Sequence, residues 1–117
     1  MGKYQDYAVP DVVYLDVDGT LLIDERVNHA LVTWARRQHS EGKQIIVWSA
    51  RGADNAERAV ELCGIGDIVT HALSKPGYVV DDLGTRFTQY MEIIHVNEID
   101  GRDRQAPKPS GVYVGSL

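Results

Sequence analysis

The sequence has little or none of what several protein classes require. It contains one cysteine, Cys63, in 117 residues, which excludes an intrachain disulfide framework and leads us to expect a cytoplasmic, reducing setting. No stretch approaches the roughly 20 consecutive apolar residues of a membrane span, so we expect no membrane partner. The first residues have no apolar core, and we expect no signal peptide there.

Basic residues are fewer than acidic ones: the sequence has 12 Lys and Arg and 17 Asp and Glu, which gives a net charge of −5. Nucleic-acid binders are usually basic, since phosphate contacts supply much of their affinity. The balance therefore argues against general nucleic-acid binding, while a local basic patch stays compatible with it. The length and the ordinary composition, 44% hydrophobic and 25% charged, fit one globular domain.

Short apolar runs alternate with stretches of helical periodicity. The pattern predicts strands at 12–17, 44–49, 67–70 and 78–80, and helices at 28–41, 54–63 and 85–95, with Asn28 and Asp54 as N-caps. Such alternation predicts an α/β fold, here a small three-layer Rossmann-like domain with a parallel sheet and no cap domain. Right-handed crossovers give a strand order of roughly 4-1-2-3. We expect this domain over 1–96 and a tail or irregular extension over 97–117.

Two acidic pairs follow apolar strands of this scheme. Asp16 and Asp18 end the first strand, and Asp81 and Asp82 end the fourth. Carboxylates about 4 Å apart repel by about 4 kcal/mol at an effective dielectric of 20, so a cluster of them needs a cation. Oxygen ligands suit a hard divalent ion, and Mg²⁺ is the usual ion beside a phosphate.

The spacing of the first pair has a chemical meaning. Side chains two apart in a strand point the same way, so Asp16 and Asp18 can reach one reacting centre if the chain stays extended through Asp18. One can then attack as a nucleophile while the other handles protons. Gly19 allows a close turn around an anion, and the amides freed in that turn can face phosphate oxygens.

The stretch DVDGTLL, residues 16–22, resembles the first motif of the haloacid dehalogenase (HAD) superfamily, D-x-D-G-T. Three further motifs resemble those of the family and follow in order: Ser49 after IIVW, Lys75 in SKP, and Asp81–Asp82 after YVV. The resemblance covers about residues 12–94. Four ordered motifs at predicted strand ends are much more specific than the first motif alone.

The resemblance implies a division of roles. Asp16 would attack phosphorus and form an aspartyl-phosphate, while Asp18 would protonate the leaving oxygen and then activate water. Mg²⁺ would be held by the Asp16 carboxylate, the Asp18 backbone carbonyl and the fourth-motif acid. We expect Asp82 as the direct ligand and Asp81 as its support.

The resemblance also implies how phosphate is held. Ser49 would donate to phosphoryl oxygens, Lys75 would balance the charge of nucleophile and phosphate, and Arg51 could hold a second substrate phosphate. The expected phosphate-binding set is Gly19, Thr20, Ser49, Ala50, Arg51 and Lys75.

Two details narrow the activity. Dehalogenases of this superfamily lack the second acid and ion pumps replace it with Thr, so Asp18 favours a phosphatase, a phosphoric monoester hydrolase. About nine residues separate Asp18 from the first predicted helix, which leaves no room for a cap domain. The resemblance then suggests a macromolecular substrate, such as a polynucleotide phosphate end, or a small metabolite closed in by a second copy of the chain as a homo-oligomer.

Two other functions stay open. A phospho-acceptor module resembling response-regulator receivers would also gather Asp, Ser or Thr, and Lys at strand ends. Receivers, however, carry the acceptor Asp on a middle strand and the Lys on the last. A catalytically idle relative acting as a binding domain is the third hypothesis.

Overall fold

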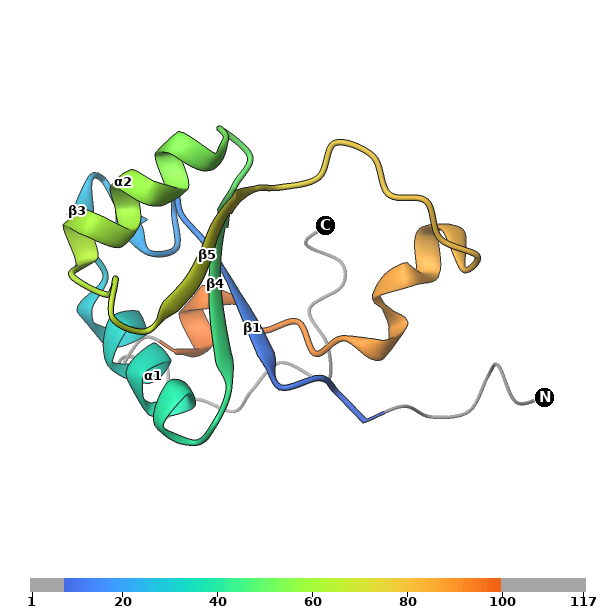
Figure 1. The fold of residues 1–117 in the computed structure, drawn as a ribbon, viewed down its shortest axis with the longest axis horizontal. Helices are drawn as coiled ribbons and strands as arrows, with labels where there is room; N and C mark the ends of the chain where they lie inside the picture. Colours follow the sequence, from blue (N-terminus) through green and yellow to red (C-terminus); the bar gives the residue numbers. More distant parts are fainter. Residues whose placement is uncertain (1–7, 100–117) are drawn as a thin grey trace.

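A three-stranded parallel sheet organises the part of the chain that the structure, a computed structural model, describes: residues 8–99. The elements in chain order are β1 (Val12–Asp16), β2 (Leu22–Ile23), β3 (Arg26–Val27), α1 (His29–Ser40), β4 (Gln44–Ser49), α2 (Ala53–Cys63), β5 (Val69–Ser74) and the 3₁₀-helices η2 (Gly84–Tyr90) and η3 (Val96–Glu98). Figure 1 shows α1 and α2 on one side of the sheet. The fold is therefore α/β, as the sequence predicts, with most of the expected tail, 100–117, outside the described residues.

The sheet has the order β1-β4-β5, and both neighbouring pairs are parallel. In register, Leu15 pairs with Val47 and Val47 with Ala72. The chain that follows β1 and the chain that follows β4 return across the helical side before the next strand of the sheet, so the carboxyl ends of all three parallel strands meet at one edge. This edge collects the residues that directly follow the strands.

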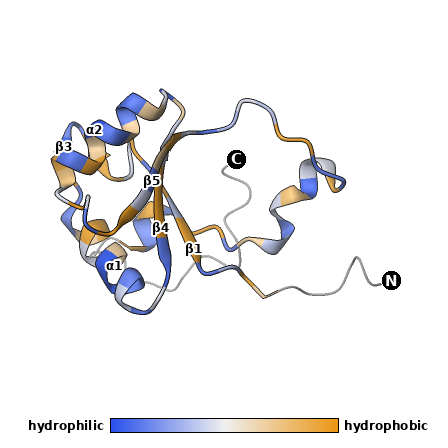
Figure 2. Cartoon of the chain, viewed as in Figure 1, coloured by the Kyte–Doolittle hydropathy of each residue, from blue (hydrophilic) through white to orange (hydrophobic). Residues whose placement is uncertain are grey.

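The core lies between the sheet and the two α-helices. Leu15, Ile45 and Val47 are at most 4% exposed, and the apolar strands stand out in Figure 2. Small residues of the helices, among them Ala35 of α1 and Ala59 of α2, are fully buried against them. Small side chains let the helices approach the sheet closely, which fixes where the helix ends lie.

The helix ends confirm most of the sequence signals. Asn28 is the N-cap of α1, and its side-chain oxygen accepts from the Leu31 amide at 3.3 Å. Gly64 ends α2 in the left-handed conformation with φ +65°. The prediction that Asp54 caps α2 is wrong, because Gly52 is the N-cap and Asp54 belongs to the first turn.

The third strand begins and ends later than predicted. Residues 65–68 form a turn in which the Ile68 amide donates to the Ile65 carbonyl at 3.0 Å, and the Asp67 carboxylate is held by Arg36 at 2.9 Å. These contacts keep Asp67 out of the sheet, so the strand is Val69–Ser74 rather than 67–70.

The predicted fourth strand at 78–80 is wrong for the described chain. Tyr78 is 96% exposed and Val80 101%, and within residues 8–99 only β4 pairs with β1. High β-propensity expresses packing on a half-buried surface, and these residues have none to pack on. The sheet thus lacks the first strand of the expected order 4-1-2-3.

The predicted helix over 85–95 is shortened to the 3₁₀-helix η2. Arg86 has non-helical backbone angles, and Met91 is extended with φ −107° and ψ 151°. Met91 is 46% exposed and Ile94 38%, so the expected apolar stripe does not cover the sheet as a helix. Among the helices of residues 8–99, none combines the length and the apolar character that crossing a bilayer requires.

A short hairpin between β1 and α1 was not predicted. β2 and β3 pair antiparallel around a two-residue turn, in which Asp24 and Glu25 have φ of +53° and +63°. Such turns usually contain Asn-Gly, because L side chains are strained at positive φ. The sequence therefore carried no turn signal, and other contacts must hold the hairpin.

Candidate functional site

Three of the predicted motifs meet at the carboxyl edge of the sheet. Asp16 is the last residue of β1, Ser49 is the last residue of β4, and Lys75 directly follows β5. The Lys75 amide donates to the Ser49 carbonyl at 2.9 Å. Parallel pairing of the strands therefore brings Ser49 and Lys75 to the same edge as Asp16, although they follow it by 33 and 59 positions in the sequence.

The Asp16 carboxylate has a partner on each oxygen. Lys75 Nζ lies 3.1 Å from Oδ1, and Thr20 Oγ1 donates to Oδ2 at 3.0 Å. The Lys75 ammonium also lies 5.8 Å from the centroid of the Trp48 ring. Asp16 and Lys75 are about one-third exposed, so the pair is held in place while remaining accessible from solvent.

The chain turns immediately after Asp16. The Leu21 amide donates to the Asp16 carbonyl at 3.2 Å and the Leu22 amide to the Val17 carbonyl at 3.0 Å. Gly19 has φ +80°, which this tight loop requires. The chain is therefore not extended through Asp18, so the condition under which strand geometry would direct both acids to one centre is not met. The loop gives the two acids separate sets of partners.

Asp18 is held by the segment that follows β4. Arg51 Nη1 lies 3.1 Å from Asp18 Oδ1, and Asn55 Nδ2 donates to Oδ2 at 3.1 Å. The Arg51 side chain is 63% exposed. Asn55 is 8% exposed, so one partner lies in solvent and the other in the interior.

Ser49 is an internal member of this network, with 1% exposure. Its Oγ accepts from the Arg51 amide and from Asn55 Nδ2, both at 3.0 Å. Because these bonds use its acceptor positions, its own hydrogen is the group left to donate. Ala50 is exposed in the turn that the Gly52 amide closes onto the Ser49 carbonyl at 3.0 Å.

Sequence reasoning missed three residues of the network: Asn55, Arg58 and Glu25. Asn55 Oδ1 accepts from Arg58 Nε at 3.2 Å and from Nη2 at 3.0 Å. Arg58 Nη1 donates to Glu25 Oε1 at 2.9 Å. The sequence offered one signal, Asn55, which is a polar residue on the same buried face of the helix as Ala56 and Ala59. Nothing in the sequence pointed to Glu25.

The predicted cluster of four acids does not form among the described residues. Asp81 and Asp82 are exposed in the segment after β5, which runs away from the sheet in Figure 1, and Asp81 Oδ1 accepts from the Leu83 amide at 2.8 Å. No group of three His, Cys, Asp or Glu in residues 8–99 is arranged to hold a metal. Instead, Asp16 and Asp18 each face one basic side chain.

Cys63 lies beneath the loop that follows Asp16, with its Sγ 3.9 Å from the Leu21 carbonyl. Burial raises the pKa of this thiol above its ordinary value of 9.0. A thiol with a raised pKa is a poor nucleophile at neutral pH. Cys63 is accordingly a packing residue rather than a reactive one.

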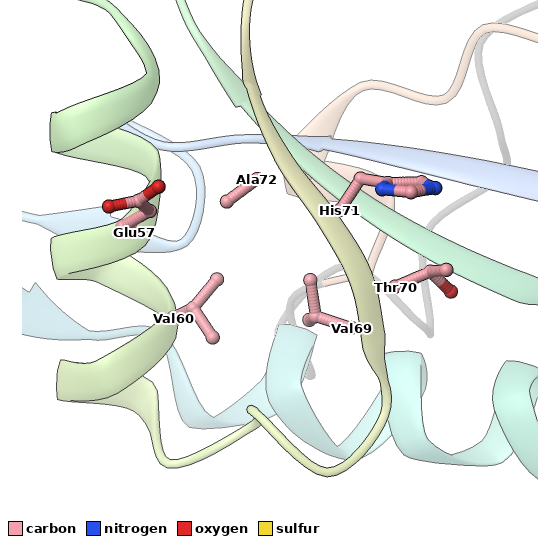
Figure 3. Close-up of a pocket in the computed structure, with 6 residues that line it drawn as sticks. All are labelled: Glu57, Val60, Val69, Thr70, His71 and Ala72. Atoms are coloured by element: carbon pink, nitrogen blue, oxygen red, sulfur yellow. The ribbon is translucent and has the colours of Figure 1, made fainter.

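A separate pocket lies between α2 and β5 (Figure 3). It is lined by Glu57, Val60, Val69, Thr70, His71 and Ala72. It shares no residue with the Asp16 and Asp18 networks. The Asp16 and Asp18 networks at the carboxyl edge of the sheet therefore lie outside this pocket.

Comparisons with protein-family models, with curated proteins and with solved structures found no significant match to this chain.

Proposed function

We propose that this chain is a phosphohydrolase that cleaves a phosphomonoester through an aspartyl-phosphate on Asp16, as its resemblance to the HAD superfamily implies. The observation that carries the proposal is the Asp16 carboxylate, accessible at a strand end and held between Lys75 and Thr20. Asp18 stands two residues away with its own partners. The proposal treats the three-stranded unit as the core of a Rossmann-like domain.

In the first half of the proposed reaction, an Asp16 oxygen attacks phosphorus in line with the leaving oxygen. The new O–P bond forms as the ester O–P bond breaks, and protonated Asp18 gives its proton to the leaving oxygen. In the second half, Asp18 takes a proton from water as that water attacks phosphorus. The Asp16–phosphorus bond breaks and inorganic phosphate leaves.

Charge balance supports this assignment of roles. Phosphoryl transfer depends mainly on positioning and on neutralising the oxygens of the transferred group. Lys75 lies at the nucleophile and can turn from Asp16 to a phosphoryl oxygen while staying within reach of both. Arg51, exposed beside Asp18, can reach a phosphate at the mouth of the site.

The described donors do not fit a magnesium ion as they stand. Asp16 and the Asp18 carbonyl are the two nearby oxygen ligands that the motif implies, and Asp82 is not placed with them. Magnesium would supply positive charge at the phosphoryl oxygens when bound. Magnesium dependence and the roles of Asp82 and Asp81 stay predictions from the motif pattern.

The proposed substrate classes depend on the short connection between Asp18 and α1, which contains no cap domain among residues 8–99. A site open at the sheet edge admits the phosphate end of a small metabolite or of a polynucleotide. Closure by a second copy of the chain is the alternative for a small substrate. A screen of nucleotides, sugar phosphates and 3′-phosphorylated oligonucleotides separates these classes.

The direct experiment measures hydrolysis of an aryl phosphate, with and without Mg²⁺, by the native protein and by Asp16→Asn. We expect turnover that is lost in the variant, because the amide cannot form the intermediate. Turnover that also requires Mg²⁺ would confirm the magnesium dependence that the motif pattern predicts. Asp54→Asn is the matched control, since it makes the same change at an exposed acid of α2 and should keep native turnover.

Equal activity of Asp16→Asn and the native protein would refute the assignment of Asp16 as the nucleophile. Stable binding of beryllofluoride without turnover of any phosphate ester would favour the receiver-like module. Binding of phosphate esters with neither turnover nor beryllofluoride capture would favour the idle binding domain.

A further inference from the structure

We propose that Asn55 is a positioning residue that fixes the carboxylate of Asp18 for proton transfer, and that Arg58 acts through it. The inference rests on the proposed function, since it assigns a task to Asp18 in that reaction. Neither Asn55 nor Arg58 belongs to any of the four motifs. Their role is derived from the contacts of α2 alone.

The orientation of the Asn55 amide is determined by its neighbours. Arg58 has only donors, so the atom that faces its Nε and Nη2 at 3.2 and 3.0 Å must be the amide oxygen. The amide nitrogen is then turned toward Asp18 Oδ2 and Ser49 Oγ, at 3.1 and 3.0 Å. An amide nitrogen has two hydrogens, and both are used.

Burial makes this contact the firmer of the two on Asp18. Asn55 is 8% exposed, whereas the Arg51 side chain on the other carboxylate oxygen is 63% exposed. A long exposed side chain gains little from a surface ion pair and exchanges readily with solvent. Asn55 therefore fixes Oδ2, and Oδ1 is the oxygen that Arg51 can release for proton exchange with the leaving group or water.

Arg58 connects this contact to the hairpin. Its guanidinium donates both to the side-chain oxygen Oδ1 of Asn55 and, at 2.9 Å, to Glu25 Oε1. Glu25 occupies the strained turn between β2 and β3, with φ +63°. A series of hydrogen bonds, Glu25–Arg58–Asn55–Asp18, thus connects the hairpin to the acid–base carboxylate through Arg58.

The expected cost of losing the contact comes from misplacement. A displacement of about 1 Å at a reacting group can cost on the order of 100-fold in rate. We expect kcat to fall by about that factor in Asn55→Asp, which keeps the shape and the Arg58 contact but turns an acceptor toward Asp18. KM should change by less than about threefold, because phosphate is still held by Lys75 and Arg51.

The experiment measures kcat and KM on an aryl phosphate for Asn55→Asp, Asn55→Ala, Arg58→Ala and the Asn55→Ala/Arg58→Ala double variant. Folding of each is checked by urea denaturation. If Arg58 acts through Asn55, its removal from the Asn55→Ala protein should change kcat by less than about twofold, within the usual error of additivity. A purely structural role would give additive losses of stability with kcat of the folded protein unchanged.

Arg36→Ala is the matched control. Arg36 pairs with Asp67 at 2.9 Å, with side-chain exposures of 43% and 65% against 41% and 63% for Arg58 and Glu25. It lies on α1 and makes none of the Asp18 contacts, so its variant should keep native kcat.

The outcomes separate the inference from the proposed function. Native turnover that requires Asp16, together with unchanged kcat in Asn55→Asp, would overturn the inference and leave the phosphohydrolase standing. Additive losses of kcat in the Asn55→Ala/Arg58→Ala double variant would show that Arg58 does not act through Asn55. Absence of Asp16-dependent turnover in the native protein would overturn both.

Discussion

Replacing Lys75 with Met separates the contribution of this lysine to stability from its contribution to chemistry. The ammonium lies 3.1 Å from Asp16 Oδ1, but the two side chains are 36% and 34% exposed. In a water-like dielectric the attraction at such a distance is about 1 kcal/mol, and the ordering of two side chains offsets part of it. Thr20 continues to donate to the other Asp16 oxygen. We therefore expect the free energy of unfolding to fall by less than about 1 kcal/mol.

The effect on turnover should be much larger. In the proposed reaction Lys75 is the cation at the attacked phosphoryl group, where stabilising donors are worth about 100-fold to 1,000-fold in kcat. The assay is hydrolysis of an aryl phosphate at saturating substrate, with urea denaturation of the same samples. Met keeps approximately the length and the apolar character of the lysine stem and removes the ammonium group.

Lys43→Met is the control for this experiment. Lys43 pairs with Glu41 at 3.5 Å, with side-chain exposures of 31% and 52%, and precedes β4 at the opposite end from the site. It should change neither quantity appreciably. The reasoning fails if Lys75→Met retains more than about half of native turnover, or if it loses more than about 3 kcal/mol of stability, the cost of an uncompensated buried charge.

Two further predictions concern the supports of the site. Asn28→Ala should lower the free energy of unfolding, measured in urea, by about 1 to 2 kcal/mol, since it removes the cap of α1 and the bond to the Thr20 carbonyl at 3.0 Å. Asn28→Asp keeps the cap acceptor and should lose less stability. Equal losses in the two variants would contradict the capping role of Asn28. Cys63 should react with iodoacetamide at pH 7 more slowly than in the urea-unfolded chain, because burial raises its pKa. The same shift means that folding favours the protonated thiol. Stability therefore declines as pH rises above the ordinary value of 9.0, and Cys63→Ala should flatten that decline; fast labelling of the folded protein would contradict the burial argument.

The local signals in the sequence succeeded where the responsible contacts are also local. The apolar run Gln44–Ser49 forms β4 with the predicted bounds, and Asn28 caps α1. Gly64 ends α2 in a conformation that glycine adopts without strain. Each of these features depends on neighbours within a few residues, which is why a pattern in the chain is enough to predict it.

The predictions that failed depended on a partner elsewhere in the fold. Residues 78–80 have strand composition, yet a strand needs a neighbour, and none pairs with them among residues 8–99. The hairpin at Asp24 and Glu25 forms with unfavourable turn residues, and it is tied to distant parts of the fold by the buried Leu22 and by Arg58, which donates to Glu25 from 33 positions later. Neither outcome can be read from the residues of the segment itself.

The residue types at the sheet edge can be read from the sequence alone: a nucleophile candidate in Asp16, a second acid in Asp18, and a cation in Lys75. Their pairing depends on the folded chain. It assigned Lys75 to Asp16, and Arg51 with Asn55 to Asp18, and it left Asp81 and Asp82 apart from both. The physical reason is that parallel strands bring their carboxyl ends together whatever their separation in sequence, whereas the direction of each side chain there depends on loops and helices packed from outside the motifs.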